Sequence, residues 1–381
     1  MPTDSSQPAA IYRPWLHRYI ILWGVAVFVL IAIGGNVTST GSGMAVPDWP
    51  TTFGYNMFTA PPSIWWPYND RFWEHFHRLM GSLVGLLTIV GAVWLWLTQR
   101  ARPWLRVLGV VLLELVILQG IMGGLRVTEA SIHLAIVHGI TGQLILALVV
   151  LLAAATGRRW IERAGQSSGG ALAYPGLRAG ALLVLNVLVI QLVLGAWMRH
   201  TGAGLAIPDL PTAYGGIIPP LTQEALDQAI AQNPLVTRPY TVAQVAIHFA
   251  HRVGALVVLT AGLGFLLSLH RTAPAHPDLR WPARWLAWLL AVQVLLGAMV
   301  IWHQRPPDIT TAHQATGAAL LAVATWLAVR VHLVSGRPCC AKQGASEPLP
   351  ADPPPDLPPD SPSDISSDSP PPGPAWKGQV A

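Results

Sequence analysis

Four histidines have the type and spacing that haem iron requires of its protein ligands. His77, His138, His251 and His313 each stand at the start of a long apolar segment. His77 and His138 are 61 residues apart, and His251 and His313 are 62 residues apart. Ionisable residues inside a membrane are costly and usually have a functional partner, and neutral imidazole is a common axial ligand of haem iron. The spacing predicts two sites, each with two facing imidazoles.

The residue four positions after each histidine is small. A residue at this distance lies on the same face of a helix, and a flat macrocycle held against that face needs a short side chain there. The four residues are Gly81, Gly142, Ala255 and Gly317. They favour a porphyrin over a compact ion, although small residues also let neighbouring helices approach closely.

Zinc and the other histidines of this region are weaker candidates. The thiolates or clustered carboxylates that usually complete a zinc site are missing from the outer half of the predicted membrane helices. Five further histidines are more typical of interfacial or hydrogen-bonding residues: His75, His133, His200, His248 and His303.

The two His-Arg pairs of the chain differ in a residue that precedes them. Glu74 stands three residues before His77, where the second copy has His248 three residues before His251. Residues at this spacing lie on nearly the same helix face. A carboxyl group beside only one site suggests proton-coupled chemistry there and makes Glu74 the candidate catalytic residue. The alternative is a salt bridge to Arg78, four residues on.

Charged residues beside the histidines have further predicted roles. Arg78 and Arg252 directly follow the histidines and suit the carboxylates of haem propionates, although helix capping or lipid head-group contact is an alternative. Asp48 and Asp209 lie in the PDWP and PDLP segments. We interpret these two aspartates as loop structure and not as catalytic residues.

The composition predicts that membrane-spanning helices position these side chains. Of the 381 residues, 52% are hydrophobic and only 11% are charged, outside the range of ordinary soluble domains. A run of roughly 20 apolar residues is long enough to cross about 30 Å of hydrocarbon. Eight spans are expected, at residues 15–37, 73–97, 104–125, 132–155, 177–198, 243–268, 283–302 and 311–334.

Basic residues predict the orientation of these spans. Arg13 and Arg18 precede the first span, and Arg100 and Arg102 follow the second. The positive-inside rule then places both termini in the cytoplasm and the four histidines near the outer face. The N-terminal segment lacks a signal-peptide or transit pattern, so a bacterial inner membrane is the expected location. The net charge of +5 reflects this loop bias and requires no nucleic-acid partner.

The sequence contains two copies of one four-span unit. TGSGMAVPDWPTTFG at residues 40–54 aligns without a gap with TGAGLAIPDLPTAYG at residues 201–215. HGITGQLILAL at residues 138–148 likewise aligns with HQATGAALLAV at residues 313–323. Each unit crosses the membrane an even number of times. The expected fold is therefore all-α integral membrane, with two four-helix bundles related by a pseudo-two-fold axis along the membrane normal.

The repeat also predicts the domain organisation. The expected segments are a cytoplasmic N-terminus at 1–14, bundles at 15–160 and 177–334, a cytoplasmic linker at 161–176 and a disordered tail at 335–381. The tail is rich in Pro, Ser and Asp and too poor in apolar residues to form a core. Cys339 and Cys340 lie on the predicted inner side, where a structural disulfide is not expected.

The motifs EHFHR, TGSGMAVPDWP, TGAGLAIPDLP, HFAHR and HQATGA resemble those of the haem A synthase family, the cytochrome oxidase assembly proteins that make haem A. The resemblance covers residues 15 to 334. It implies an oxidoreductase that oxidises the C8 methyl group of haem O to the formyl group of haem A by successive hydroxylations. The implied partners are the substrate haem O, a haem O synthase, an unidentified electron donor and the lipid bilayer.

The same resemblance implies a role for each site residue. His251 and His313 are the implied axial ligands of a haem B cofactor in the second bundle. His77 and His138, with Arg78, are assigned to the substrate haem in the first bundle, and Glu74 is implied to act in catalysis. This chain departs from the family in two ways: the loop at residues 37–72 lacks the cysteine pair that many relatives carry, and Thr38 stands where an arginine is often found.

Two functions of other classes remain compatible with these residues. A non-enzymatic di-haem protein that passes electrons across the membrane would explain the four histidines but not the difference between Glu74 and His248. A haem transporter or chaperone would suit the parallel repeat, although the spans contain few internal breaks and no evident charged pathway.

Overall fold

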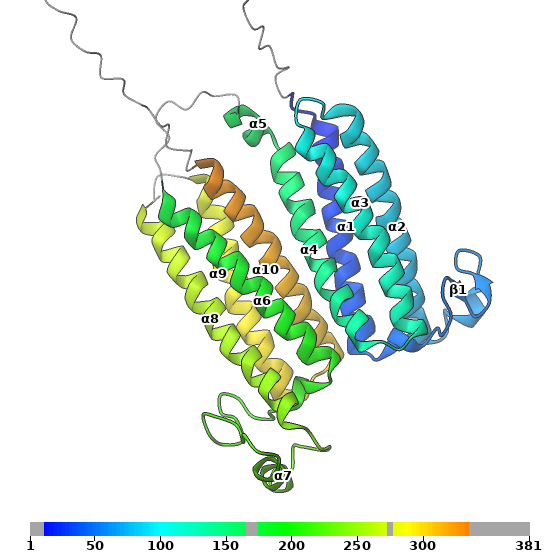
Figure 1. Cartoon of the computed structure of the whole chain (residues 1–381), viewed down its shortest axis with the longest axis vertical. Coiled ribbons are helices and arrows are strands. Elements are labelled where there is room, and N and C mark those ends of the chain that lie inside the picture. Colours follow the sequence, from blue (N-terminus) through cyan, green and yellow to red (C-terminus); the bar gives the residue numbers. More distant parts are fainter. Residues whose placement is uncertain (1–10, 165–173, 273–276, 335–381) are drawn as a thin grey trace, which may run out of the picture. The chain divides into compact units, whose positions relative to one another are not determined.

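A computed structural model describes residues 11–164, 174–272 and 277–334, so the predicted tail with Cys339 and Cys340 lies outside the described residues. Within these ranges, eight helices are long and apolar enough to cross a membrane. They are α1 (Pro14–Ser39), α2 (Asn69–Thr98), α3 (Pro103–Thr128), α4 (Ile132–Thr156), α6 (Pro175–His200), α8 (Val242–Thr272), α9 (Pro277–Trp302) and α10 (Pro307–Val334) (Figure 1). The shortest has 25 residues and extends about 37 Å at about 1.5 Å per residue. The expected class, an all-α integral membrane protein, is confirmed.

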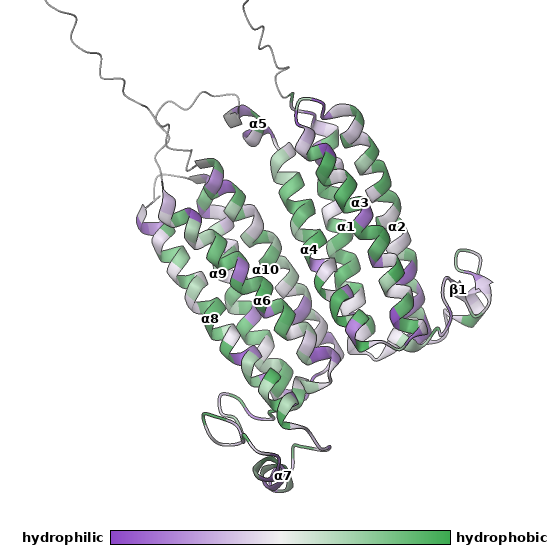
Figure 2. Cartoon of the chain, in the orientation of Figure 1, coloured by the Kyte–Doolittle hydropathy of each residue, from purple (hydrophilic) through white to green (hydrophobic). Residues whose placement is uncertain are grey.

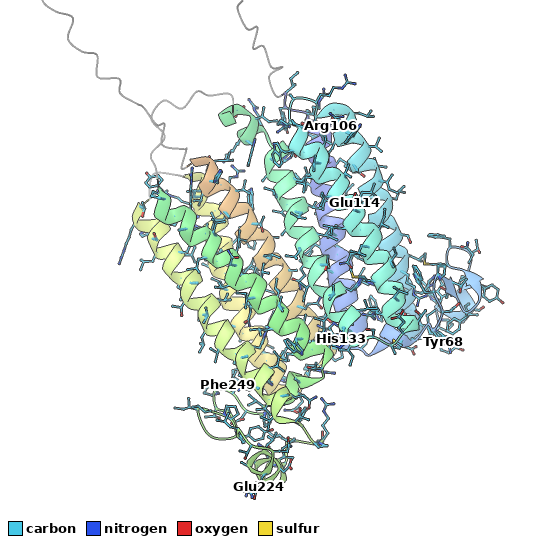
Figure 3. The ribbon with its side chains drawn as sticks, viewed as in Figure 1. Tyr68, Arg106, Glu114, His133, Glu224 and Phe249 are labelled. Carbon is cyan, nitrogen blue, oxygen red and sulfur yellow. The ribbon has the colours of Figure 1, made fainter. Side chains whose placement is uncertain are left out.

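Hydrophobic residues cover most of the length of these helices (Figure 2). Glu114 is an exception, because it lies midway along α3 with an exposed side chain (Figure 3). The observed helices begin earlier than predicted at several places, most of all at α9, which starts at Pro277 and not at residue 283. Proline is tolerated in the first turn because the first backbone N–H groups of a helix have no partner within it. Pro282, one turn later, removes a single backbone hydrogen bond.

Several short elements connect the spans. They are α5 (Arg158–Ala164), α7 (Gln223–Ala231), the 3₁₀ turns η1 (Ser42–Met44), η2 (Pro62–Ile64) and η3 (Ala203–Leu205), and the antiparallel strands β1 (Thr51–Thr52) and β2 (Tyr55–Asn56). The sequence patterns did not predict these elements. α5 begins inside the predicted first bundle and extends into the predicted linker, and α7 lies in the longer connecting loop of the second copy.

The eight helices pack as two groups of four. In the first group α1 contacts α2 and α4, and α3 contacts α2 and α4; in the second group α6, α8, α9 and α10 contact one another in the same order. The groups meet where α10 packs against α1 and α4, and where α4 packs against α6. The same neighbour pairs thus recur in both groups, while the expected two-fold axis stays a prediction.

Apolar side chains fill the end of each group that lies away from the predicted ligands. The buried core of the first group includes members at residues 16–27 of α1 and 145–155 of α4. That of the second group includes members at 177–188 of α6 and 320–331 of α10. On α4 and α10 these cores begin seven residues, about two helical turns, after His138 and His313. The opposite end, which we call the histidine end, therefore holds the predicted sites.

The loops at the histidine end fold alike in the two copies. Asp48 accepts hydrogen bonds from the backbone N–H groups of Phe53 and Gly54, both at 2.8 Å. Asp209 accepts from the N–H groups of Tyr214 (2.7 Å) and Gly215 (2.8 Å). Gly54 and Gly215 have φ angles of 80° and 79°, which glycine adopts without strain. The interpretation of the two aspartates as loop structure is confirmed.

Hydrogen bonding holds both aspartates in their ionised form. Burial alone would raise the pKa of Asp48, but its bonds from Gly54, the Thr51 hydroxyl and Phe53 outweigh burial and lower the pKa below its usual value. The pKa of Asp209 is lowered in the same way. Each carboxylate therefore closes its loop at neutral pH.

Candidate functional site

Each of the four predicted ligand histidines lies against a glycine of the preceding long helix. A Cβ atom added at the glycine would lie 2.9–3.1 Å from Cε1 of the imidazole ring, closer than ordinary van der Waals contact. The pairs are Gly34 of α1 with His77 of α2, Gly123 of α3 with His138 of α4, Gly195 of α6 with His251 of α8, and Gly297 of α9 with His313 of α10. The glycines therefore decide how deeply each imidazole enters its bundle.

The structure brings the predicted ligands together in pairs. His77 and His138 lie close enough to interact electrostatically, and so do His251 and His313. In the described part of the chain, Nδ1 of His77, His138 and His313 is buried without a hydrogen-bond partner. A buried nitrogen without a partner costs free energy unless a ligand satisfies it.

This donor set fits a haem. Haem iron takes its protein ligands from the two axial directions, which two facing imidazoles can supply. The described residues contain no group of three or more His, Cys, Asp or Glu side chains that could hold a bare metal ion. Two imidazoles per bundle, in apolar surroundings, thus match a porphyrin better than a zinc ion.

The small residues beside the histidines differ between the bundles. A Cβ added at Gly81 or Gly85 of α2 would meet no atom within 4 Å. At Gly254 of α8 the same Cβ would lie 2.1 Å from Oε1 of Gln191, and at Gly317 of α10 it would lie 3.4 Å from Nε2 of Gln293. The helix face beside His77 is therefore open, whereas Gln191 lies beside His251. The faces beside His138 and His313 both have a glutamine nearby, because a Cβ added at Gly142 would lie 4.0 Å from Nε2 of Gln119.

Three glutamines accompany the glycine-histidine pairs. Gln119 and Gln191 donate hydrogen bonds to the backbone carbonyl oxygens of His138 (3.1 Å) and His251 (2.8 Å). Gln293 lies with Nε2 at 3.4 Å from Nε2 of His313. Each glutamine stands four residues before the glycine of its pair; the fourth pair has Leu30 at this place. Sequence reasoning missed these residues, although the repeated Gln-x-x-x-Gly spacing identifies them.

Glu74 anchors the first loop at the histidine end. Its Oε1 forms a buried ion pair with Nη2 of Arg78 at 2.8 Å, and its Oε2 accepts a 2.8 Å hydrogen bond from the N–H of Val46. Arg78 also donates to the carbonyl oxygens of Val46, Asp48 and Thr51, at 2.7–3.0 Å. Four of the five N–H groups of Arg78 are thereby used. The structure thus contains the salt bridge that was the alternative interpretation of Glu74, while the catalytic role of Glu74 and the substrate contact of Arg78 stay predictions.

His248 occupies the same place in the second copy. Its Nδ1 lies 3.2 Å from the N–H of Ile207, and its Nε2 lies 3.2 Å from Nε of Arg252. Arg252 also donates to the carbonyl oxygens of Ile207 and Thr212. Neutral imidazole accepts only one hydrogen bond, whereas a carboxylate accepts several. His248 is therefore the weaker of two equivalent loop anchors. The propionate contact of Arg252 stays a prediction.

Arg199 of α6 connects the two bundles at the histidine end. Its guanidinium donates to the carbonyl oxygen of Gly35 (2.6 Å) and to the Ser39 hydroxyl (2.7 Å), both on α1. It also donates to Oε1 of Gln314, next to His313 on α10, at 3.1 Å. The side chain thus links the helix that packs on His77 to the helix that carries His313.

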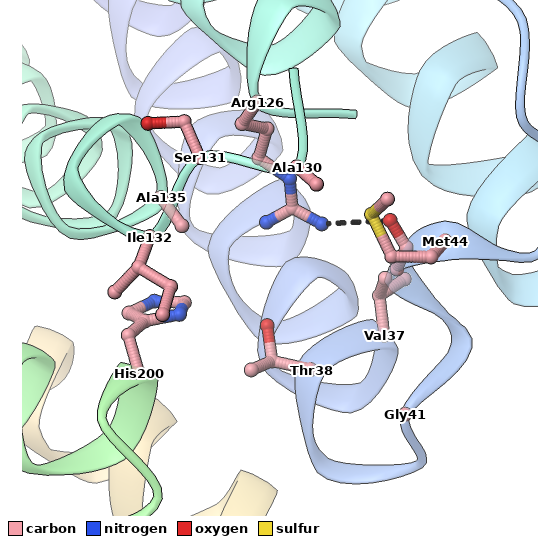
Figure 4. A pocket seen from close by; sticks show the side chains of 11 residues that line it. Val37, Thr38, Gly41, Met44, Arg126, Ala130, Ser131, Ile132, Ala135 and His200 are labelled. Carbon is pink, nitrogen blue, oxygen red and sulfur yellow. Dashed lines mark hydrogen bonds between the residues drawn. The ribbon is translucent and has the colours of Figure 1, made fainter. Parts of the chain in front are cut away.

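Arg126 of α3 is a further residue that sequence reasoning missed. It lines a cavity of about 270 Å³ at the histidine end, together with residues from α1, η1, α4 and the end of α6 (Figure 4). Its guanidinium donates one hydrogen bond to the carbonyl oxygen of Gly43, at 3.2 Å. Arg126 lies in the last turn of α3, directly after the predicted third span. His200 also lines the cavity, while His133 lies at the same end, at the start of α4 (Figure 3).

Comparison with known proteins identifies the family of the chain. Residues 67–325 match the family described as cytochrome oxidase assembly protein. A protein of Methylorubrum extorquens named heme A synthase is 28% identical over 90% of this chain and 94% of its own length. The heme A synthases of Methylobacterium radiotolerans and Bartonella tribocorum are 28% and 24% identical, over 90% and 83% of this chain and 93% and 91% of theirs. Because the family match covers well over half of the residues, the chain belongs to the cytochrome oxidase assembly protein family.

Proposed function

We propose that this protein is a haem A synthase, which oxidises the C8 methyl group of haem O to a formyl group by successive hydroxylations for cytochrome oxidase assembly. The observation that carries the proposal is the set of four histidines, each seated against a glycine, in a member of this family. A bis-imidazole site in each bundle accounts for one haem as cofactor and one as substrate.

The second bundle is the proposed cofactor site, with His251 and His313 as axial ligands of haem B. When bound, haem B would supply the redox chemistry of the reaction. The glutamines support this assignment because each imidazole ring of the second bundle has one beside it: Nε2 of Gln191 lies 3.1 Å from Nδ1 of His251, and Nε2 of Gln293 lies 3.4 Å from Nε2 of His313. A resident cofactor benefits from ligands that are fixed in advance.

The first bundle is the proposed substrate site, with His77 and His138 facing the haem O iron. The open face beside Gly81 and Gly85 supports this assignment, because a substrate must enter and leave. The apolar helices around it suit the long hydrophobic tail of haem O. Glu74, three residues before His77, is the proposed proton acceptor. Its ion pair with Arg78 holds the carboxyl group in place.

The arrangement of Glu74 and His248 also supports a second candidate function. Both side chains anchor their loops through equivalent contacts, to Val46 and Arg78 in one copy and to Ile207 and Arg252 in the other. The acid is then explained without chemistry at the first site. A non-enzymatic di-haem electron-transfer protein would need four histidines and two anchored loops, and nothing more.

The proposed location is a bacterial inner membrane with both termini in the cytoplasm, which the arginine distribution supports. The histidine end would then face outward. A haem O synthase and an electron donor are the proposed partners, since one supplies the substrate and the other supports oxidation.

Haem analysis distinguishes the two functions. The chain is co-expressed with a haem O synthase in a host that lacks haem A. The extracted haems are separated by chromatography and identified by mass spectrometry. We expect haem A or its hydroxylated precursor only when this chain is present. Unmodified haem O and haem B alone, with folded protein and an electron donor supplied, would refute the enzyme and favour electron transfer.

A further inference from the structure

The cavity at the histidine end has a positively charged wall. Arg126 projects into it from α3, and His200 borders it from α6 (Figure 4). Arg126 lies close enough to interact electrostatically with Arg78, Glu74 and His138. Two guanidinium groups and one carboxylate leave one uncompensated positive charge when the imidazoles are neutral. A partly desolvated charge of this kind is stabilised by an anion.

Arg126 has the donors that an anion requires. A guanidinium carries five N–H groups, and within the described residues Arg126 uses one of them, for the carbonyl oxygen of Gly43. Arg78 has used four on loop carbonyls and Glu74, and Arg199 is bonded to α1 and Gln314. Arg126 is therefore the arginine beside the first pair of histidines whose remaining N–H groups can bind a carboxylate through two parallel hydrogen bonds.

Two further side chains of the cavity can donate. The Ser131 hydroxyl accepts a hydrogen bond from the N–H of Leu134, which leaves its own proton for a ligand. The ring nitrogens of His200 have no hydrogen-bond partner in the described part of the chain. Thr38, in contrast, already donates its proton to the carbonyl oxygen of Gly34. The polar groups that face the cavity are thus mainly donors, which suits a carboxylate.

The size of the cavity limits the ligand. Its volume of about 270 Å³ is below the range of about 300–1,000 Å³ that encloses a whole small molecule. It suits a side arm of a larger ligand whose body lies between His77 and His138. Porphyrins of the haem type carry such arms as propionates, and a guanidinium fork matches a carboxylate in charge and geometry.

We propose that Arg126, with Ser131 and His200, binds a propionate carboxylate of the porphyrin substrate in the first bundle. This inference rests on the proposed function, since it takes the first bundle as the substrate site. It assigns the substrate contact expected of Arg78 to a residue on a different helix. Arg126 would act as a binding and positioning residue that sets the rotation of the macrocycle about its axial ligands.

A porphyrin titration tests the proposal. Purified protein that retains its cofactor haem is titrated with ferric protoporphyrin IX and, separately, with its dimethyl ester, and absorption reports binding of the second equivalent. We expect Arg126→Gln to weaken binding of the diacid roughly 10- to 100-fold, as for loss of a charge-assisted hydrogen bond. The dimethyl ester should bind the variant and the unchanged protein alike. Arg126→Lys, which keeps the charge, should recover part of the loss.

Controls separate this inference from the proposed function. Arg100→Gln removes an exposed charge between α2 and α3, at the other end of the bundle, and should leave both affinities unchanged. The cofactor haem spectrum reports folding of each variant. An unchanged diacid affinity in Arg126→Gln, or an equal loss for the ester, would overturn the inference.

Three further results would also count against it. Mass spectrometry that shows loss of a bound anionic phospholipid in Arg126→Gln, at constant porphyrin affinity, would assign the cavity to a lipid head group. If the unchanged protein takes up no second porphyrin, the substrate site and the inference both fall. If it makes haem A while Arg126→Gln binds porphyrin normally, only the inference falls.

Discussion

Replacing Glu74 with histidine separates loop anchoring from catalysis, because the second copy already carries histidine at this place. Glu74 and Arg78 are 5% and 10% exposed, so their ion pair is buried. Breaking such a pair costs about 3–5 kcal/mol when one charge is left alone, which makes Glu74→Ala a poor test. In Glu74→His, the new imidazole can accept from the N–H of Val46, as His248 does from Ile207. We expect that variant to lose about 3 kcal/mol, the lower end of this range, because the Val46 hydrogen bond is kept while Arg78 loses its carboxylate partner.

Glu74→His should affect the rate of haem A formation much more than it affects the free energy of unfolding. A positioned general base contributes about 10²- to 10⁴-fold to a rate. The neutral imidazole of Glu74→His has one acceptor nitrogen, which the N–H of Val46 would occupy, so no lone pair remains to take the proton. We therefore expect Glu74→His to keep its cofactor haem and to make haem A at least 100-fold more slowly. The assay is chromatography with mass analysis of extracted haem, normalised to folded protein.

The reverse substitution provides the matched control. His248→Glu gives the second loop the anchor of the first, and it should be at least as stable as the unchanged protein because a carboxylate can accept from both Ile207 and Arg252. Its haem A formation should be unaltered. If Glu74→His forms haem A within about tenfold of the normal rate, the carboxylate is a loop anchor and the reasoning that makes it a base is wrong.

Three further predictions follow from the contacts. Gly297→Val should displace the His313 ring, because an added Cβ would lie 3.0 Å from it, and should remove the cofactor haem spectrum. In the control Gly264→Ala the added Cβ meets no atom within 4 Å, so the spectrum should be retained. Equal haem content in both variants would refute the role of Gly297 in placing His313. Arg199→Gln should lower the free energy of unfolding by roughly 2–5 kcal/mol through lost bonds between the bundles, and an unchanged melting temperature would contradict this. The pKa of Asp48 is lowered on folding, so its stabilisation is present above its unfolded value of about 3.8 and is lost as the pH falls through the folded value. Proteolysis of the loop should accelerate below about pH 4, an effect that Asp48→Asn should reduce and that constant cleavage would disprove.

Periodicity and composition predicted the number and class of the spans because a membrane helix must satisfy its backbone internally and expose an apolar surface. Those constraints act on every residue of a span, so a run of roughly 20 apolar residues in the sequence is enough to reveal them. The internal repeat predicted the recurrence of the loops, and Asp48 and Asp209 were correctly interpreted as loop structure. The starts of α9 and α10, at Pro277 and Pro307, precede the predicted spans. The first turns contain Asp278 and Asp308, which fall outside an apolar run although the first turn of a helix tolerates them.

The candidate site could be predicted only in part. Histidine is rare in apolar segments and draws attention by its chemistry, whereas the glycines and glutamines that seat each imidazole are ordinary residues of membrane helices. Gly34 and Gln191 gain their roles from a neighbouring helix. Such contacts depend on how two helices are rotated relative to each other. The residue pattern of a single helix does not give that rotation.

By itself the sequence determined an all-α membrane protein with two copies of a four-span unit and a histidine pair in each. These properties depend on residue type, run length and spacing along the chain. Only the tertiary structure decided that Glu74 and His248 anchor equivalent loops, that Arg78 is occupied by carbonyl oxygens and that Arg126 uses a single donor among the described residues. The physical reason is that hydrogen-bonding capacity is finite. Which partner a guanidinium or carboxylate finds is settled by the groups that folding brings within 3 Å or so, and these come from distant parts of the chain.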